Sequence, residues 1–138
     1  MEGDRLVNDS AFNCHVLSGL TVEAFYGIYS SDDPAELILV LLKLKEKKLW
    51  QRFFLDAFIG FWEEWEQAVI AEDLEDDLVI DLGEQHDVLG CQVNSIECTG
   101  DADQLIPSAI WFDIGKTILK MSFIDDDGEE FGSKLEIM

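Results

Sequence analysis

The chain has 138 residues, of which 30 are Asp or Glu and only 9 are Lys or Arg, so its formal net charge is −21. Hydrophobic residues make up 48% of the chain and aromatic residues 11%. These fractions exclude a disordered acidic chain, which lacks the apolar residues needed for a core. The length favours one domain over residues 1–138 that folds without a disulfide or a metal.

The charge also limits the classes of partner. A field of this sign repels phosphate backbones and anionic membranes, and few cations are present to displace counterions, so direct nucleic-acid binding is not expected. The same field attracts basic proteins. No stretch approaches the roughly 20 apolar residues that cross a bilayer, and residues 1–4 lack the basic start and apolar stretch of a secretion signal. We therefore expect a cytoplasmic protein. The alternative is that the charge only maintains solubility.

The first elements are short. Phe12, Cys14 and Val16 alternate with polar residues, which predicts a strand that ends at Ser18. Residues 21–29 fit a short helix that begins at Thr21, which we favour. They also fit a strand with one apolar face made of Val22, Ala24, Tyr26 and Ile28.

Two longer helices are expected next. Asp33, Pro34 and Glu36 match an N-cap, a first helical position and a capping glutamate, which predicts a helix over 34–48. The competing interpretation is a strand that buries Ile38, Val40, Leu42 and Leu44.

Residues 50–71 show the clearest pattern. Apolar residues recur there at steps of three and four, the spacing of one helical face: Phe54, Phe58, Phe61, Trp65 and Ala68. The apolar arc of this predicted helix is roughly 200° wide, so the helix is expected either in the centre of the core or in a protein interface. A single helix over 34–71 would be about 57 Å long, which predicts a break between Lys47 and Trp50.

The charges are unevenly distributed. Five of the nine basic residues lie within 43–52, and none lies between Arg52 and Lys116, a span with sixteen acidic residues. Around Asp81, the alternation of Leu78, Ile80 and Leu82 predicts a short strand with acids on its outer face. Acids on ordered backbone can match a partner's cations, and the alternative is an ordinary acidic loop. The candidate partner-binding residues are Glu72, Asp73, Glu75, Asp76, Asp77, Asp81, Glu84, Asp87, Asp101 and Asp103.

After residue 77 the apolar period changes to two. Strands are expected near 78–82, 88–98, 108–114, 117–124 and 131–137, and the last three should form a meander with turns at Gly115-Lys116 and at residues 126–128. The predicted fold class is therefore α+β, with N-terminal helices, one of them aromatic-rich, packed on a C-terminal antiparallel sheet of about four to six strands.

No catalytic or cofactor motif was found. A zinc site from Cys14, His15, His86, Cys91 and Cys98 lacks paired ligand spacing, and Cys91 and Cys98 are expected within a strand. A Cys91 nucleophile with His86 as its base and Asp87 nearby is disfavoured, because acidic surroundings suppress the thiolate. The acidic run at 125–130 places Phe123 and Lys134 at the first and last ligand positions of a calcium loop, where carboxylates are required.

These observations predict a non-enzymatic acidic binding protein, without cofactor or metal. Its partner would be a basic protein that handles nucleic acid. Two settings fit: an immunity protein for a nuclease toxin, or an inhibitor that mimics nucleic acid. The alternative is a structural or assembly subunit that oligomerises, for example as a homodimer, through its aromatic helix. The basic cluster over 43–52 could pair with acids of a second copy or simply face solvent.

Overall fold

The fold consists almost entirely of antiparallel β-structure. The computed structural model describes residues 4–29, 37–56, 58–66, 78–126 and 130–138. These residues form the strands β1 (Asp4–Asp9), β2 (Phe12–Asn13), β3 (Val22–Tyr29), β4 (Leu37–Leu44), β5 (Trp50–Asp56), β6 (Ile59–Trp65), β7 (Leu78–Asp81), β8 (Val93–Asp101), β9 (Ile106–Ile114), β10 (Thr117–Asp126) and β11 (Glu130–Ile137). The helical turns in these ranges are a 3-10 turn, η1 (His15–Leu17), and one turn of helix, α2 (Leu82–Gln85). The α+β prediction is therefore wrong.

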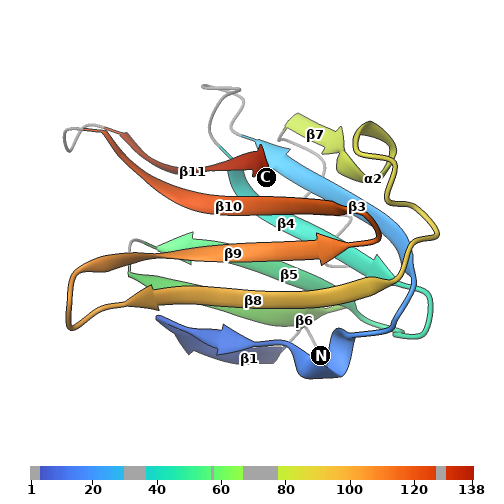
Figure 1. Ribbon diagram of the computed structural model, residues 1–138, viewed down its shortest axis with the longest axis horizontal. Helices are drawn as coiled ribbons and strands as arrows, with labels where there is room; N and C mark the ends of the chain where they lie inside the picture. Colours follow the sequence, from blue (N-terminus) through green and yellow to red (C-terminus); the bar gives the residue numbers. More distant parts are fainter. Residues whose placement is uncertain (1–3, 30–36, 57, 67–77, 127–129) are drawn as a thin grey trace.

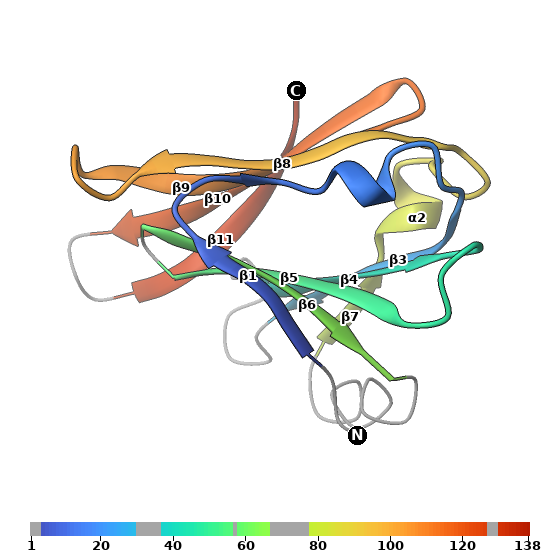
Figure 2. The same cartoon turned by 90° about the horizontal axis from the view of Figure 1, so that it is seen from below.

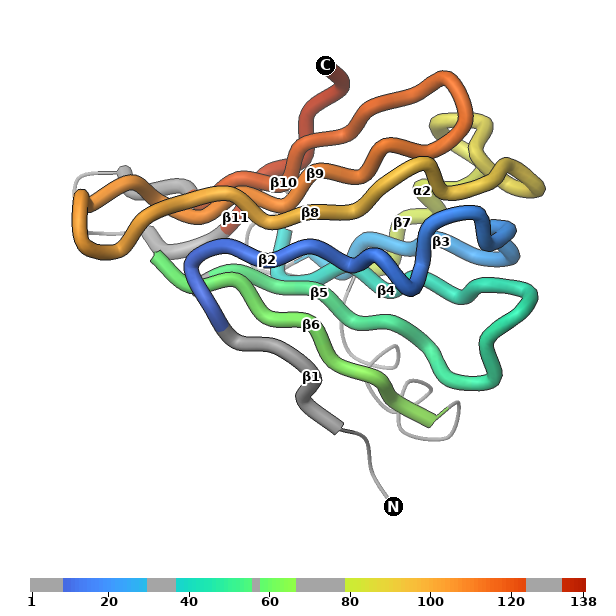
Figure 3. Tube along the Cα trace, turned by 60° about the horizontal axis from the view of Figure 1, so that its bottom comes forward, coloured from blue at the N-terminus to red at the C-terminus, as the bar shows by residue number. Residues whose placement is uncertain are grey.

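The strands are arranged in two layers. One layer has the order β7-β3-β4-β5-β6-β1 and the other has the order β11-β10-β9-β8-β2. The layers join where Ser133 of β11 pairs with Leu37 of β4. Figure 2 shows the two layers edge on, and Figure 3 shows β8, β9 and β10 on one side of the molecule and β4, β5 and β6 on the other. This arrangement is a two-layer sandwich, in which each sheet buries one face against the other.

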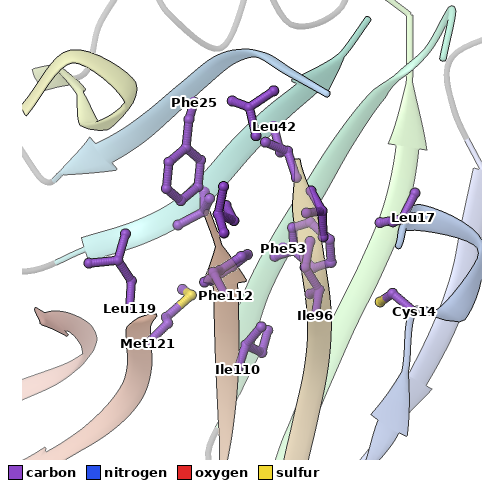
Figure 4. Close-up of a cluster of buried hydrophobic side chains, with 14 of the residues drawn as sticks. Cys14, Leu17, Phe25, Leu42, Phe53, Ile96, Ile110, Phe112, Leu119 and Met121 are labelled. Carbon is purple, nitrogen blue, oxygen red and sulfur yellow. The ribbon is translucent and has the colours of Figure 1, made fainter. Parts of the chain in front are cut away.

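Aromatic side chains from both layers fill the space between them. Phe112 of β9 lies with its ring centroid 5.3 Å from Phe53 of β5, at an interplanar angle of 85°, and 5.5 Å from Phe25 of β3. None of the three side chains is exposed to solvent. Figure 4 shows this cluster, with Cys14 and Leu17 at its margin. The core therefore depends on contacts between distant parts of the sequence.

The helix expected over 21–29 is replaced by strand β3. Ala24, Tyr26 and Ile28 share its outer face, as the strand alternative requires, but Val22 packs in the core together with Phe25. The reason is a register shift between Val22 and Ala24 in the pairing with β4. A bulge of this kind moves the residues on one side of it to the opposite face of the sheet.

The helix expected over 34–48 is also absent where the structure describes this segment. Residues 37–44 form β4, while residues 34–36 lie outside the described ranges. Val40 and Leu42 point into the core, and Leu39 and Leu41 belong to a second apolar cluster on the outer face of the same layer. Ile38, which the strand interpretation buried, is 40% exposed. A strand that is apolar on both faces has no period of two, so its sequence does not indicate a strand.

The aromatic helix expected over 50–71 is a β-hairpin over 50–65, and residues 67–71 lie outside the described ranges. Trp50 pairs with Trp65 and Phe54 pairs with Phe61, whose rings stack at 4.4 Å. The seven-residue separation of Phe54 and Phe61, which matches two helical turns, is here the separation of two partners across a hairpin. The break expected between Lys47 and Trp50 coincides with the turn that joins β4 to β5.

A charged pair lies among the aromatic residues on the outer face of this hairpin. The Arg52 guanidinium lies 4.8 Å from the ring centroid of Trp65 and 5.5 Å from that of Phe54. Its Nε atom is 3.8 Å from Oε1 of Glu63, which also accepts a hydrogen bond of 2.9 Å from the Trp65 indole. Glu63 is only 5% exposed. Pairing and hydrogen bonding offset the cost of burying these charges.

The second half of the chain follows the predicted order of strands. β9, β10 and β11 pair consecutively, which confirms the meander, and Gly115 and Lys116 connect β9 to β10. β7 covers the predicted strand at 78–82. The strand expected to begin at residue 88 begins at Val93 as β8, so Cys98 lies in a strand but Cys91 lies in the loop before it. The first predicted strand is reduced to β2, because the chain turns into η1 at His15.

Candidate protein-binding surface

One end of the molecule, where β4 turns into β5 and β9 turns into β10 (Figure 1), carries five of the nine cations: Lys43, Lys45, Lys47, Lys48 and Lys116. Lys43 lies 3.3 Å from Glu23, and Lys47 lies 3.5 Å from Glu64. Together with Arg52 and Glu63, these pairs connect members of the basic cluster to acids of the same chain. Acids of the same chain therefore pair with these three cations.

Three of the candidate acids lie at this same end, around α2. Oδ1 of Asp81 accepts a hydrogen bond of 3.0 Å from the backbone N–H of Glu84, so Asp81 caps α2. Glu84 and Asp87 are exposed. Asp87 and Lys116 line one open depression of about 510 Å³. Acids and cations are thus mixed at the α2 end, and Asp81 has a structural role there.

Two other candidate acids lie at the opposite end, where Asp101 ends β8 and Asp103 lies in the turn that leads to β9 (Figure 1). The carboxylate of Asp101 is half-buried, and its Oδ1 atom accepts hydrogen bonds from the backbone N–H groups of Asp103, at 3.0 Å, and of Gln104, at 3.3 Å. Asp103 is exposed. Local bonds of this type hold a turn in one conformation. The acids of this turn therefore occupy fixed positions.

The same end carries a second acidic hairpin. The pairing of β10 with β11 runs to Asp126 opposite Glu130, with Asp125 opposite Phe131. Neither residues 99–108 nor residues 123–132 include a Lys or Arg. We call residues 99–108, together with residues 123–126 of β10 and 130–132 of β11, the hairpin end. Its sequence is acidic without compensating cations, in contrast to the α2 end.

The structure therefore divides the predicted binding residues instead of forming one surface from them. Asp81, Glu84 and Asp87 lie at the α2 end, and Asp101 and Asp103 lie at the hairpin end. The remaining candidates, Glu72, Asp73, Glu75, Asp76 and Asp77, lie outside the described residues. Because the two groups are at opposite ends of the long axis, a partner that covers one end does not cover the other.

The cysteine chemistry considered from the sequence is not assembled. Cys91 and His86 line the depression near α2, but the Cys91 thiol lies 3.8 Å from the Asp87 carbonyl oxygen, and within the described ranges no hydrogen bond joins it to the imidazole. Burial lowers the pKa of His86. Burial also raises the pKa of the Cys98 thiol to about 11, and burial followed by the neighbouring Cys98 raises the pKa of Cys14. Cys14 and Cys98 are therefore unreactive thiols in the core.

The zinc and calcium sites considered from the sequence have no geometric support in the described part of the chain. There, no three side chains of the types His, Cys, Asp or Glu are grouped so that they could hold a metal ion. The two end positions of the hypothetical calcium loop lie in β10 and β11, where Phe123 pairs with Ser133 and the exposed Lys134 lies 3.4 Å from Glu136. Asp125, Asp126 and Glu130 of the acidic run thus lie in the paired strands of a β-hairpin.

The apolar part of the hairpin end was not predicted from the sequence. Leu105 and Ile106 follow the turn of Asp101, and they are 72% and 49% exposed. The sequence does contain a feature that indicates it: two large apolar residues lie between Gln104 and Pro107, in a segment otherwise typical of a turn. In the chain as far as it is described, no helix is long and apolar enough to cross a bilayer. Comparison of the sequence and the structure with protein-family models, curated proteins and solved structures found no match.

Proposed function

We propose that this chain is a non-enzymatic acidic binding protein that covers the basic, nucleic-acid-handling surface of a partner protein. The observation that carries the proposal is the segregation of charge: a net charge of −21 is combined with an end of the molecule whose hairpin sequences contain no Lys or Arg. A field of one sign at one end steers a basic protein and accelerates association. An immunity protein for a nuclease toxin and an inhibitor that mimics nucleic acid both fit this chemistry.

The ordered backbone between β8 and β9 supports the proposal. Asp101 and Asp103 lie in a turn fixed by hydrogen bonds, so less conformational entropy is lost on binding than when a flexible acidic tail becomes ordered. The alternative function, an assembly subunit, depends on an aromatic helix over 50–71 as the interface between copies. Residues 50–65 form a β-hairpin instead, and Phe53 and Trp62 are buried in the core. The helical interface is therefore not part of the proposal.

The compartment is part of the proposal. We infer a reducing, cytoplasmic location, because Cys14, Cys91 and Cys98 are free thiols and two of them are buried in the core.

Two experiments test the function. The first is an affinity pull-down at low and high salt, in which we expect a basic protein to be retained at low salt and released as screening increases. The second is an electrophoretic shift assay at low salt with duplex and single-stranded nucleic acid, for which no binding is expected. Tight, salt-sensitive binding to nucleic acid would refute the proposal, because the phosphate repulsion on which it rests would have been overcome.

A further inference from the structure

The turn between β8 and β9 presents apolar side chains to solvent. Leu105 is 72% exposed, the largest value for a large hydrophobic side chain in the described residues, and the adjacent Ile106 is 49% exposed. Both lie where the hairpin projects at the end of the molecule (Figures 1 and 3). Isolated exposed apolar residues are common on protein surfaces. Two neighbouring ones at a projecting turn form a small contact surface.

The conformation of Leu105 is unfavourable for leucine. Its φ angle is +57°, in the left-handed region that favours glycine, and its N–H donates a hydrogen bond of 3.3 Å to the carbonyl oxygen of Ala102. The side chain is not part of either apolar cluster of the fold. Neither core packing nor backbone geometry thus accounts for a leucine at this position, where glycine would fit the turn better.

The charges around the two side chains specify what they can meet. Asp101 pairs with Ile106 across the hairpin, Asp103 lies two residues before Leu105, and residues 99–108 contain no Lys or Arg. A partner surface with carboxylates opposite these acids would be repelled, whereas Lys or Arg would be attracted. The matching surface is therefore an apolar depression with a basic rim.

We propose that Leu105 and Ile106 are the anchor of the partner interface and enter an apolar depression surrounded by Lys and Arg on a basic protein. This inference rests on the proposed function and specifies its contact. Interface energy is concentrated in a few side chains that fill pockets, while surrounding charges mainly set the association rate. Leu105 and Ile106 then control dissociation, and Asp103 contributes to association.

Leu105→Gly is the decisive variant, because it removes the anchor and also relieves the left-handed strain, so the variant is expected to fold at least as well as the parent protein. Val16→Ser is the matched control, since Val16 is 63% exposed in η1, away from the hairpin end. The probe is the most abundant basic protein that the wild-type chain retains at low salt and releases at high salt, purified before measurement. Dissociation constants and rates are then measured for all variants, with thermal unfolding in parallel.

We expect Leu105→Gly to weaken affinity roughly tenfold or more, mainly through faster dissociation. Its unfolding midpoint should not fall. Val16→Ser should bind within about twofold of wild type, as expected for a residue outside the interface. Wild-type affinity in Leu105→Gly would overturn the anchor while leaving the proposed function intact. Retention of no basic protein by the wild-type chain would overturn the proposed function and this inference together.

Discussion

Replacing Phe112 with alanine should remove the central contact between the two layers. Phe112 is completely buried on β9, and its ring contacts Phe53 and Phe25 of the opposite layer at centroid distances of 5.3 and 5.5 Å. Truncation of a buried phenylalanine costs about 3–5 kcal/mol. Each aromatic pair contributes about 0.5–1.5 kcal/mol beyond the buried area, so we expect a loss in the upper half of that range, about 4–5 kcal/mol.

A loss of this size is a large share of the roughly 5–15 kcal/mol that stabilises a typical domain. Urea denaturation followed by circular dichroism measures it, with an unchanged m-value indicating that the unfolded state is the same. The control is Trp111→Phe on the same strand. Trp111 is only half-buried and faces away from the core, with its indole bonded to Thr99 at 2.9 Å, so the cost should stay near 1 kcal/mol.

A double-mutant cycle tests the contact itself. Phe53→Leu and Phe112→Ala should be non-additive by about 0.5–1.5 kcal/mol, because each change removes the same edge-to-face pair. The two layers would not pack as described if Phe112→Ala cost no more than Trp111→Phe, or if the effects at positions 53 and 112 simply added.

Three further changes probe other contacts of the fold. Gly60→Ala should destabilise the domain by about 1–3 kcal/mol in urea denaturation, because the added Cβ would lie 2.5 Å from the Cys98 sulfur. Combining it with Cys98→Ala should recover part of this loss, and purely additive effects of the two substitutions would contradict the contact. Stability should fall as pH rises from about 9 to 11, because burial raises the pKa of the Cys98 thiol to about 11, so this thiol stays protonated in the folded state while it ionises in the unfolded state. In alkaline denaturation, the Cys98→Ala variant should lose part of this pH dependence. The same dependence of stability on pH in the variant and the parent protein would count against a buried thiol. Asp81→Ala should lower the free energy of unfolding by about 1 kcal/mol in thermal unfolding, because it removes the carboxylate that accepts a hydrogen bond from the Glu84 N–H. Asp81→Asn should lower it less, because asparagine keeps an acceptor oxygen. Equal losses of stability in the two variants would argue against the cap.

The second half of the fold could be predicted from the sequence because its strands bury one face. In β9, Ile110, Phe112 and Ile114 alternate with Trp111 and Asp113, and Gly115 marks the turn. Its φ of +59° is one that glycine adopts readily. The alternation and the turn residue together indicate a hairpin, and the structure has one there.

The first half could not be predicted in this way, because β4 is apolar on both faces and β5 and β6 carry aromatic side chains on both faces. Leu41 and Leu42 point in opposite directions, yet neither is exposed to solvent. Strands with large apolar residues on both faces lack a clear period of two, and apolar residues three and four positions apart then occur by chance. The apparent helical pair of Phe54 and Phe61 is a cross-strand pair. The pairing of these strands therefore determines the fold here, although the local sequence pattern favours helices.

The binding residues were predicted only in part, for a related reason. Asp81, Glu84 and Asp87 are close in sequence to Asp101 and Asp103, and the sequence analysis treated them as one group. β8 runs the length of the molecule between them, which carries the two groups to opposite ends. Proximity in sequence is not proximity in space once a strand of nine residues intervenes.

The most direct test of the account compares two variants that each lose two negative charges, one from each end. The hairpin variant carries Asp101→Asn and Asp103→Asn, and the α2 variant carries Glu84→Gln and Asp87→Asn. Their affinities for the captured basic protein are measured over a range of salt concentrations. We predict that the hairpin variant binds severalfold more weakly at low salt with a flatter salt dependence, while the α2 variant stays within about twofold of wild type. A loss confined to the α2 variant, or a wild-type affinity independent of salt, would contradict the account.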